Sequence, residues 1–186
     1  MHLNVRSLFI PDVKLIETAR IVDARGYFAE TYVRQDFAAH GITYDFLQDN
    51  QSASTAVGTI RGLHFQAPPF VQTKLIRVLS GRIFDVVVDL RRSSETYGKY
   101  ATIELSEAGG EQLLVPAGFA HGYCTLEAHT VILYKVDAPY SAAHDRGINW
   151  ADPMLKIEWP IKPEKAILSN KDAALPLLSE LPVIFD

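Results

Sequence analysis

Short runs of β-branched and other apolar residues, bounded by turns that contain glycine or proline, fill the middle of the chain and predict β-strands. These runs cover residues 74–79, 82–90, 100–105, 112–115, 122–126 and 130–136. The dipeptide Ser80-Gly81 separates the first two runs and predicts a hairpin between them. Short strands at this spacing indicate an antiparallel sandwich or barrel, such as a jelly roll.

Helical signals are scarce along the chain. Residues 34–40 predict a short helix, and residues 171–178 predict another that Pro176 interrupts. The chain has no internal repeat and no long linker, and its 186 residues, 48% hydrophobic, suffice for one core. We therefore expect a single all-β domain over residues 1–186, with residues 159–163 forming a surface strap before the C-terminal tail.

The charge pattern argues against a nucleic-acid-binding surface. A net charge of −4 arises from 18 basic and 22 acidic residues, with no block of like charge. Cys124 is the only cysteine, which fits a reducing compartment. Residues 1–6 lack a basic segment followed by an apolar run, and no stretch approaches the ~18 apolar residues of a membrane span. We expect a cytoplasmic protein without membrane contact.

The segment from Gly58 to Gly81 resembles the first half of the cupin metal-binding motif, G-x5-H-x-H-x3-4-E-x6-G. Gly58 lies six positions before His64, and Gly81 lies seven after Lys74. However, Gln66 replaces the second histidine, and Lys74 replaces the glutamate. A lysine ammonium repels a divalent cation, and one imidazole cannot hold a metal alone. The segment therefore predicts proton chemistry inside a barrel, with no metal.

Strand alternation orients the side chains of this segment. Residues i and i+2 share a face, so His64 and Gln66 are expected to point into the barrel while Leu63 and Phe65 pack on the other side. Buried polar groups need hydrogen-bond partners. The polar groups on this inward face therefore either hydrogen-bond to other protein groups or bind a ligand.

Three further polar residues are ambiguous on local grounds. His121 ends the second half of the cupin frame, P-x-G-x-x-H, at residues 116–121, but a lone histidine in a strand is most often a structural residue. Tyr134 shares a strand face with aliphatic neighbours, as a core tyrosine does. Asp172 is typical of a solvated or capping residue.

Seven sequence blocks resolve this ambiguity by resemblance. They are residues 48–50, 61–66, 74–78, 84–89, 115–122, 133–135 and 168–172. Their order and spacing resemble the dTDP-4-dehydrorhamnose 3,5-epimerase family, a group of metal-independent cupins. The resemblance covers residues 28–176 and implies a cupin-type double-stranded β-helix, or jelly roll, with short flanking helices.

The resemblance also implies a reaction that needs no cofactor. The family inverts C3 and C5 of dTDP-4-dehydro-6-deoxy-D-glucose to give dTDP-4-dehydro-L-rhamnose, by moving protons next to the C4 ketone. By resemblance, His64 is the base, Tyr134 the acid on the opposite face of the ring, and Lys74 stabilises the enolate. Asp172 would pair with His64 and fix its tautomer.

Substrate-binding residues follow from the same resemblance. Arg25, Phe28 and Glu30 match residues that reach into a neighbouring subunit, which implies a homodimer with exchanged N-terminal strands and a C-terminal tail near the site. The other matches contact the diphosphate, base or sugar; they are Gln48, Asn50, Arg61, His121, Lys171 and Tyr140, the last by stacking on thymine. Asp145 is a further candidate, although glutamate is usual at that position.

Three alternatives stay open at this point. A relative that inverts only C3 or only C5 of another dTDP-4-keto-deoxysugar would share His64, Lys74, Tyr134 and Asp172, and product stereochemistry would separate it. A non-catalytic sugar-nucleotide-binding cupin would lose an acid or a base, whereas both are present. A metal-dependent cupin would bind stoichiometric metal, against which Lys74 argues.

Overall fold

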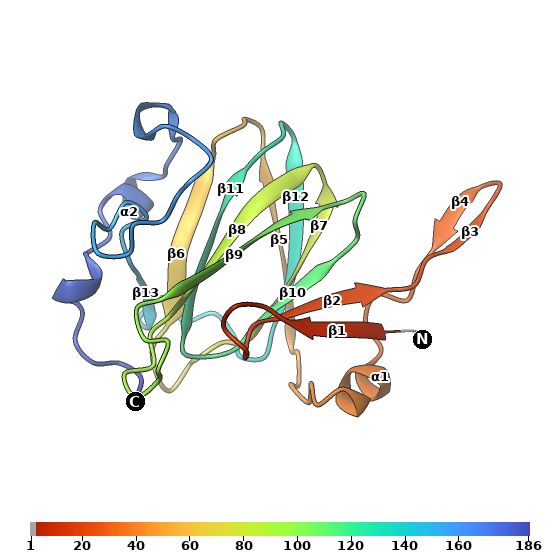
Figure 1. Cartoon of the computed structure of the whole chain (residues 1–186), viewed down its shortest axis with the longest axis horizontal. Helices are drawn as coiled ribbons and strands as arrows, with labels where there is room; N and C mark the ends of the chain where they lie inside the picture. Colours follow the sequence, from red (N-terminus) through yellow and green to blue (C-terminus); the bar gives the residue numbers. More distant parts are fainter. Residues whose placement is uncertain (1–2) are drawn as a thin grey trace.

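The computed structural model describes residues 3–186 and contains two antiparallel sheets that face each other (Figure 1). The six-stranded first sheet has the order β1 (Leu3–Ser7), β2 (Lys14–Thr18), β10 (Gln112–Val115), β7 (Lys74–Ser80), β12 (Thr130–Val136) and β5 (Gln48–Ser54). The five-stranded second sheet has the order β13 (Asp145–Gly147), β6 (Ile60–Gln66), β11 (Phe119–Thr125), β8 (Arg82–Asp89) and β9 (Tyr100–Ser106). The predicted all-β, cupin-type fold is confirmed.

Both faces of the second sheet are covered. Its inner face packs against the first sheet through an aliphatic cluster that includes Ile76, Val87 and Ile132. Its outer face carries Leu63 and Phe65, which pack under the C-terminal tail, as strand alternation predicts. Inward and outward burial together fix the register of β6, because a slip of one residue would exchange its two faces.

The predicted hairpin at Ser80-Gly81 is wrong. Strand β7 pairs with β10 and β12 in the first sheet, whereas β8 pairs with β11 and β9 in the second. The chain therefore turns a corner between the sheets, as jelly-roll strands do. Gly81 has a φ of +79°, and a Cβ there would lie 2.5 Å from the Thr130 hydroxyl oxygen, so glycine suits the corner.

Helical structure is limited to short segments at the periphery. Helix α1 (Arg34–Ala39) matches the prediction, but α2 (Asn170–Ala173) is half as long as the predicted helix over 171–178. A residue before proline is disfavoured in the helical region, which ends α2 ahead of Pro176. Single 3-10 turns occupy Pro163–Lys165 and Leu178–Glu180. No helix within residues 3–186 is long and apolar enough to cross a membrane.

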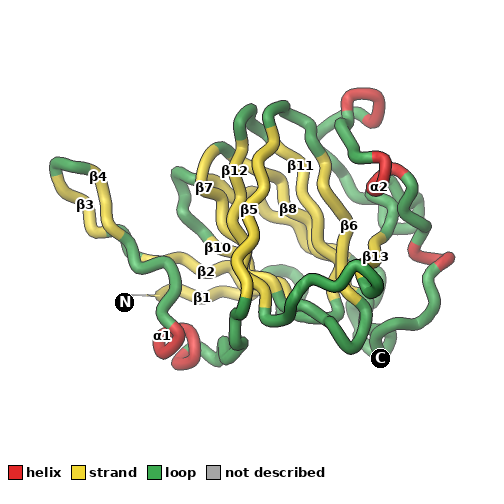
Figure 2. The backbone as a smooth tube through the Cα atoms, turned by 180° about the vertical axis from the view of Figure 1, so that it is seen from behind, coloured by secondary structure: helices red, strands yellow, loops and turns green. Residues whose placement is uncertain are grey.

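A two-stranded hairpin, β3 (Ile21–Asp23) and β4 (Gly26–Phe28), extends away from both sheets (Figures 1 and 2). All six of its strand residues are exposed, including Val22 at 76% and Phe28 at 64%. Figure 1 places it at the opposite end of the molecule from α2. An isolated hairpin with apolar exposed side chains is not stable by itself, so it needs packing from elsewhere.

Candidate active site

Two adjoining cavities lie between the sheets. The larger, of about 420 Å³, is lined by both sheets and by the segment around α2, and the smaller, of about 290 Å³, has mainly polar side chains. Four side chains line both cavities: His64, Lys74, Tyr134 and Lys171. Ligand pockets usually measure roughly 300–1,000 Å³, so the two cavities together suit an elongated ligand.

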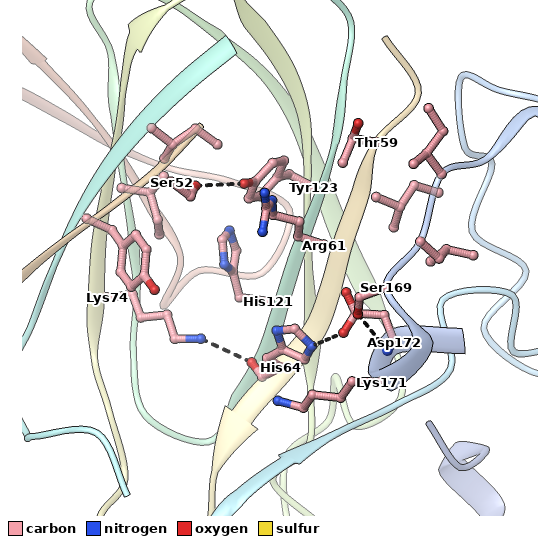
Figure 3. Close-up of a pocket in the computed structure, with 16 residues that line it drawn as sticks. Ser52, Thr59, Arg61, His64, Lys74, His121, Tyr123, Ser169, Lys171 and Asp172 are labelled. Atoms are coloured by element: carbon pink, nitrogen blue, oxygen red, sulfur yellow. Dashed lines mark hydrogen bonds and ion pairs between the residues drawn. The ribbon is translucent and has the colours of Figure 1, made fainter. Parts of the chain in front are cut away.

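His64 on β6 forms a hydrogen-bonded pair with Asp172 on α2 (Figure 3). The distance from Nε2 to Oδ1 is 2.8 Å, and the Asp172 side chain is only 5% exposed. Burial acts to raise the pKa of Asp172, but the hydrogen bond from His64 and other donors outweigh it and leave that pKa below its usual value. An ionised Asp172 keeps the proton on Nε2, so Nδ1 is free to accept one.

A close approach between β6 and β11 positions His64. Gly62 has a φ of +138°, and a Cβ there would lie 2.4 Å from the Cα of Gly122. Only glycine allows the two backbones to approach so closely. The contact brings His64 directly opposite His121 in the strand pairing, so both imidazoles line the larger cavity.

Lys74 reaches the site from the first sheet. Its Nζ donates a hydrogen bond of 3.2 Å to the backbone carbonyl of His64 in the second sheet. Burial lowers the pKa of Lys74 to about 8, although Asp145 and Asp85 act to raise it. Within the described residues 3–186, no carboxylate lies at ion-pair distance from Nζ. At neutral pH the ammonium is therefore charged and available to a ligand.

Tyr134 on β12 faces the cavities from the first sheet, whereas His64 belongs to the second. Burial raises the pKa of Tyr134, and the nearby Arg61 only partly offsets this effect. The phenol thus keeps its proton at neutral pH. A proton acceptor and a proton donor consequently stand on opposite walls of one space.

Gln66, which replaces a metal ligand of the cupin motif, has a structural role. Its side-chain amide donates to the carbonyls of Phe70 and Pro139 at 2.6 and 3.2 Å, and its oxygen accepts from the backbone N–H of Ser141 at 2.6 Å. These bonds anchor the loop that presents Tyr140. Both N–H groups of the amide are engaged with the protein, and its oxygen already accepts one hydrogen bond, so a ligand has little to gain from Gln66.

The smaller cavity contains a polar network. Asp145 accepts hydrogen bonds from Lys171 and, at 3.0 Å, from the Tyr140 hydroxyl. Gln48 donates to Asn50 at 2.8 Å and accepts weakly from the backbone N–H of Tyr140 at 3.4 Å. Tyr140 itself is 60% exposed, so its ring is free to stack on a planar group.

The chemistry of these groups suits proton transfer next to a carbonyl. Within residues 3–186, no three histidine, cysteine or acidic side chains are grouped so that they could hold a metal ion. The junction of the cavities instead offers an imidazole acceptor, a phenol donor and an ammonium. Inversion through an enolate requires such an acceptor, such a donor and a cation for the developing oxyanion.

Comparison with known proteins agrees with this chemistry. A family model described as dTDP-4-dehydrorhamnose 3,5-epimerase matches residues 7–180. The chain belongs to this family. A dTDP-4-dehydrorhamnose 3,5-epimerase from Sinorhizobium fredii is 53% identical over 184 residues, which covers 99% of this chain and 94% of that protein.

Two solved structures of epimerases superpose closely on the chain. The enzyme from Bacillus anthracis, solved with TDP and pyrophosphate, is 49% identical with a TM-score of 0.92, covering 95% of this chain and 99% of that one. The dTDP-6-deoxy-D-glucose-3,5-epimerase from Legionella pneumophila, in complex with dTDP-4-keto-L-rhamnose, is 39% identical with a TM-score of 0.93. The match covers 97% of this chain and 95% of that one.

The structure places most of the predicted site residues around the two cavities. His64, Lys74, Tyr134 and Asp172 meet at the larger cavity, and seven binding candidates line one or both cavities; these are Gln48, Asn50, Arg61, His121, Tyr140, Asp145 and Lys171. Arg25, Phe28 and Glu30 are not among the lining residues of either cavity. Arg25 and Phe28 belong to the β3–β4 hairpin, and Arg25 pairs there with Asp23 at 2.5 Å.

Sequence reasoning missed two residues that support the site. Ser169 caps α2 by accepting a hydrogen bond of 3.0 Å from the backbone N–H of Asp172, which orients that carboxylate. Asp85 on β8 is completely buried and hydrogen-bonds to His121. A single acid within the aliphatic run 83–88 was the available signal, because a buried charge needs a partner.

Proposed function

We propose that the protein is an isomerase that converts dTDP-4-dehydro-6-deoxy-D-glucose to dTDP-4-dehydro-L-rhamnose by inverting C3 and C5. The observation that carries the proposal is the placement of His64 and Tyr134 on opposite sheets, with Lys74 at the junction of two cavities. Inversion requires that one face of the sugar loses a proton and the other face gains one. A base and an acid on opposite walls meet this requirement.

The proton and electron movements follow from the geometry. His64 Nδ1 takes the proton from C5, and the electrons of the C–H bond move to the C4 oxygen, where the Lys74 ammonium stabilises the enolate. The Tyr134 hydroxyl then delivers a proton to C5 from the other wall. Once His64 has released its proton to solvent and Tyr134 has regained one from solvent, the same sequence at C3 completes the conversion. Asp172 holds the imidazole in the accepting tautomer and stabilises it once it is protonated.

We assign the polar groups that take no part in proton transfer to binding the nucleotide part of the substrate. Arg61 offers donors suited to phosphate oxygens, although in the free protein its Nε donates to Ser54 at 3.2 Å and its Nη2 to the Ala53 carbonyl at 3.0 Å. Gln48, Asn50 and Tyr140 line the smaller cavity, and Lys171 lines both. We assign the exposed ring of Tyr140 to stacking on the base.

The test of this function is hydrogen exchange with solvent. The protein is incubated with dTDP-4-dehydro-6-deoxy-D-glucose in heavy water, and the sugar is followed by NMR. We expect deuterium at both C3 and C5, and a rhamnose nucleotide after trapping with a 4-keto reductase. Label at one carbon only would assign a single-site epimerase, and binding of dTDP without any label would assign a binding protein.

The exposed β3–β4 hairpin supports a second part of the proposal, a homodimer with exchanged N-terminal segments. Arg25 and Phe28 lie at the opposite end of the molecule from α2 (Figure 1), so they are remote from Asp172 of their own chain. In a dimer the same residues would enter the neighbouring cavity, and the exposed Ile21 and Val22 would be covered. Each site would then need both subunits.

Mixing two inactive variants tests this arrangement. We expect Arg25→Ala to be weakly active and His64→Asn to be inactive when each is expressed alone. Activity should return after co-expression, because a mixed dimer contains one site with both residues intact. Random pairing would restore about a quarter of the sites. Light scattering should give twice the 20.7-kDa chain mass at micromolar concentration. A monomeric mass, or no regained activity in mixed dimers isolated with two affinity tags, would exclude exchange.

A further inference from the structure

Asp85 is a completely buried acidic group behind the wall of the larger cavity. Its side chain is 0% exposed, and its strand neighbours on the same face, Ile83 and Val87, belong to the aliphatic core. Both carboxylate oxygens lie within hydrogen-bond distance of His121 Nε2, at 3.0 and 2.9 Å. Within the described part of the chain, no other side chain donates to Asp85. A buried carboxylate in this setting destabilises the fold unless its partner holds it.

The His121–Asp85 pair lies next to the His64–Asp172 pair. Strand order in the second sheet is β6–β11–β8, and His121 stands directly opposite His64 across the β6–β11 pairing. Asp85 is a diagonal neighbour of His121, whose direct partner on β8 is Val87. Figure 3 shows both imidazoles projecting into the same cavity. Two imidazole–carboxylate pairs thus share one wall.

The two imidazoles are held in the same way. In each case Nε2 faces the carboxylate, and within residues 3–186 no hydrogen bond reaches Nδ1 of either ring. His121 lines the larger cavity while its side chain is 10% exposed, so little besides a cavity ligand can reach its free nitrogen. The orientation of His121 is therefore set from behind by Asp85.

We propose that Asp85 is a positioning residue for the epimerisation, which keeps the proton on His121 Nε2 and thereby presents His121 Nδ1 to an oxygen of the sugar beside the reacting carbons. The inference rests on the proposed function. Asp85 acts through His121 and does not touch the substrate. Carboxylates that orient metal-bound imidazoles from behind contribute about 10- to 100-fold, and we expect a similar effect here.

A double-mutant cycle tests the inference. We expect Asp85→Asn to lower kcat/KM about 10- to 100-fold in the native background and to have almost no further effect when His121 is already asparagine. An undiminished effect in the His121→Asn background would overturn the proposal, because Asp85 would then act elsewhere. Lys74 is the other group through which it could act, since Asp85 raises the pKa of Lys74.

Asp89 supplies a matched control on the same strand. Its side chain is also 0% exposed, but its partners are Arg91, Ser94 and Thr96, and it lines neither cavity. Asp89→Asn should reduce thermal stability and leave kcat/KM of the folded enzyme within about twofold. An equal loss of kcat/KM in both variants would mean that Asp85 is merely structural, and the proposal would fall.

An NMR measurement separates failure of this inference from failure of the proposed function. Long-range ¹H–¹⁵N correlations on the unliganded native protein report which imidazole nitrogen carries a proton. We expect His121 Nε2 to be protonated, whether or not Nδ1 is too. An unprotonated Nε2 would overturn the inference even if turnover is normal. Absence of substrate turnover by the native protein would overturn the function and leave the NMR result standing.

Discussion

Replacing His64 with asparagine should abolish deuterium uptake at both C3 and C5. Asparagine retains a polar side chain that can still contact Asp172, but it cannot accept a proton at neutral pH. A placed general base contributes about 10²–10⁴-fold, and here two successive inversions depend on it. We therefore expect no product above background in the heavy-water assay, while dTDP binding, measured by calorimetry, stays within a few-fold.

The contrast with Tyr134→Phe makes this prediction specific. Loss of the phenol removes the proton donor and leaves His64 intact. Exchange at the α-carbons should therefore continue in part while inversion fails, so label enters with retained configuration. Equal loss of exchange and inversion in Tyr134→Phe would contradict the role of Tyr134 as the donor.

His129→Asn is a suitable control for the His64 variant. His129 lies in the turn before β12 with a φ of 55°, which asparagine adopts readily, and it lines neither cavity. Its activity should equal that of the native enzyme. Retained exchange at either carbon in His64→Asn would identify a second base, for which His121 on the same wall is the nearest candidate.

The sequence predicted the strands whose side chains are mainly buried on one or both faces. Residues 130–136 and 112–115 match β12 and β10, because local apolar runs report burial directly. Strand β5, with the sequence QDNQSAS, was missed. Its polar side chains include Gln48, Asn50 and Ser52, which line the cavities. Because the side chains of β5 line the cavities, they are polar, and the apolar pattern by which a strand is recognised in a sequence is absent.

Sheet pairing was the part that local signals could not determine. Ser80-Gly81 predicts that the two flanking strands pair with each other, but the strands that pair with β7 and β8 lie elsewhere along the chain. The same holds for the site. His64 and Asp172 are separated by 108 residues, and only the family resemblance brought them together before the structure did.

Asp85 shows that a single exception to the apolar pattern of a strand can indicate a functional residue. Its position within an aliphatic run violates the local pattern, and sites of function are where such violations are expected. Pairing with His121 depends on the β8–β11 register, which no local pattern specifies. The sequence could therefore identify Asp85 as a candidate, but the fold was needed to identify His121 as its partner.

Replacing Lys74 with methionine should raise stability and nearly abolish turnover. Methionine keeps the length of the apolar stem but removes the charge that stabilises the enolate oxygen. Loss of one such donor typically costs about 10²–10³-fold in kcat. Burial is the main reason that the pKa of Lys74 falls to about 8, so the folded protein disfavours this charge at neutral pH. Removing it should raise Tm by about 2–6 °C.

The pH dependence of the native enzyme follows with a definite sign. The ammonium is the active form and is present below the folded pKa of about 8, so kcat/KM should fall as pH rises through that value. In the unfolded chain the pKa returns to its ordinary, higher value. Between the two values the unfolded state binds more protons, and the stability of the native protein should therefore increase with pH.

Lys135→Met serves as the control for both effects. Lys135 is on the same strand as Tyr134 but its Nζ bonds to Asp49 at 2.9 Å, outside the cavities. This variant should keep its turnover and the decline above pH 8, with no gain in Tm. A fall in Tm for Lys74→Met would mean that attraction to Asp85 and Asp145 outweighs burial. Turnover that survives in Lys74→Met would exclude Lys74 from the mechanism. Among residues 3–186, Lys171 is the only other lysine or arginine that lines both cavities, and it already pairs with Asp145.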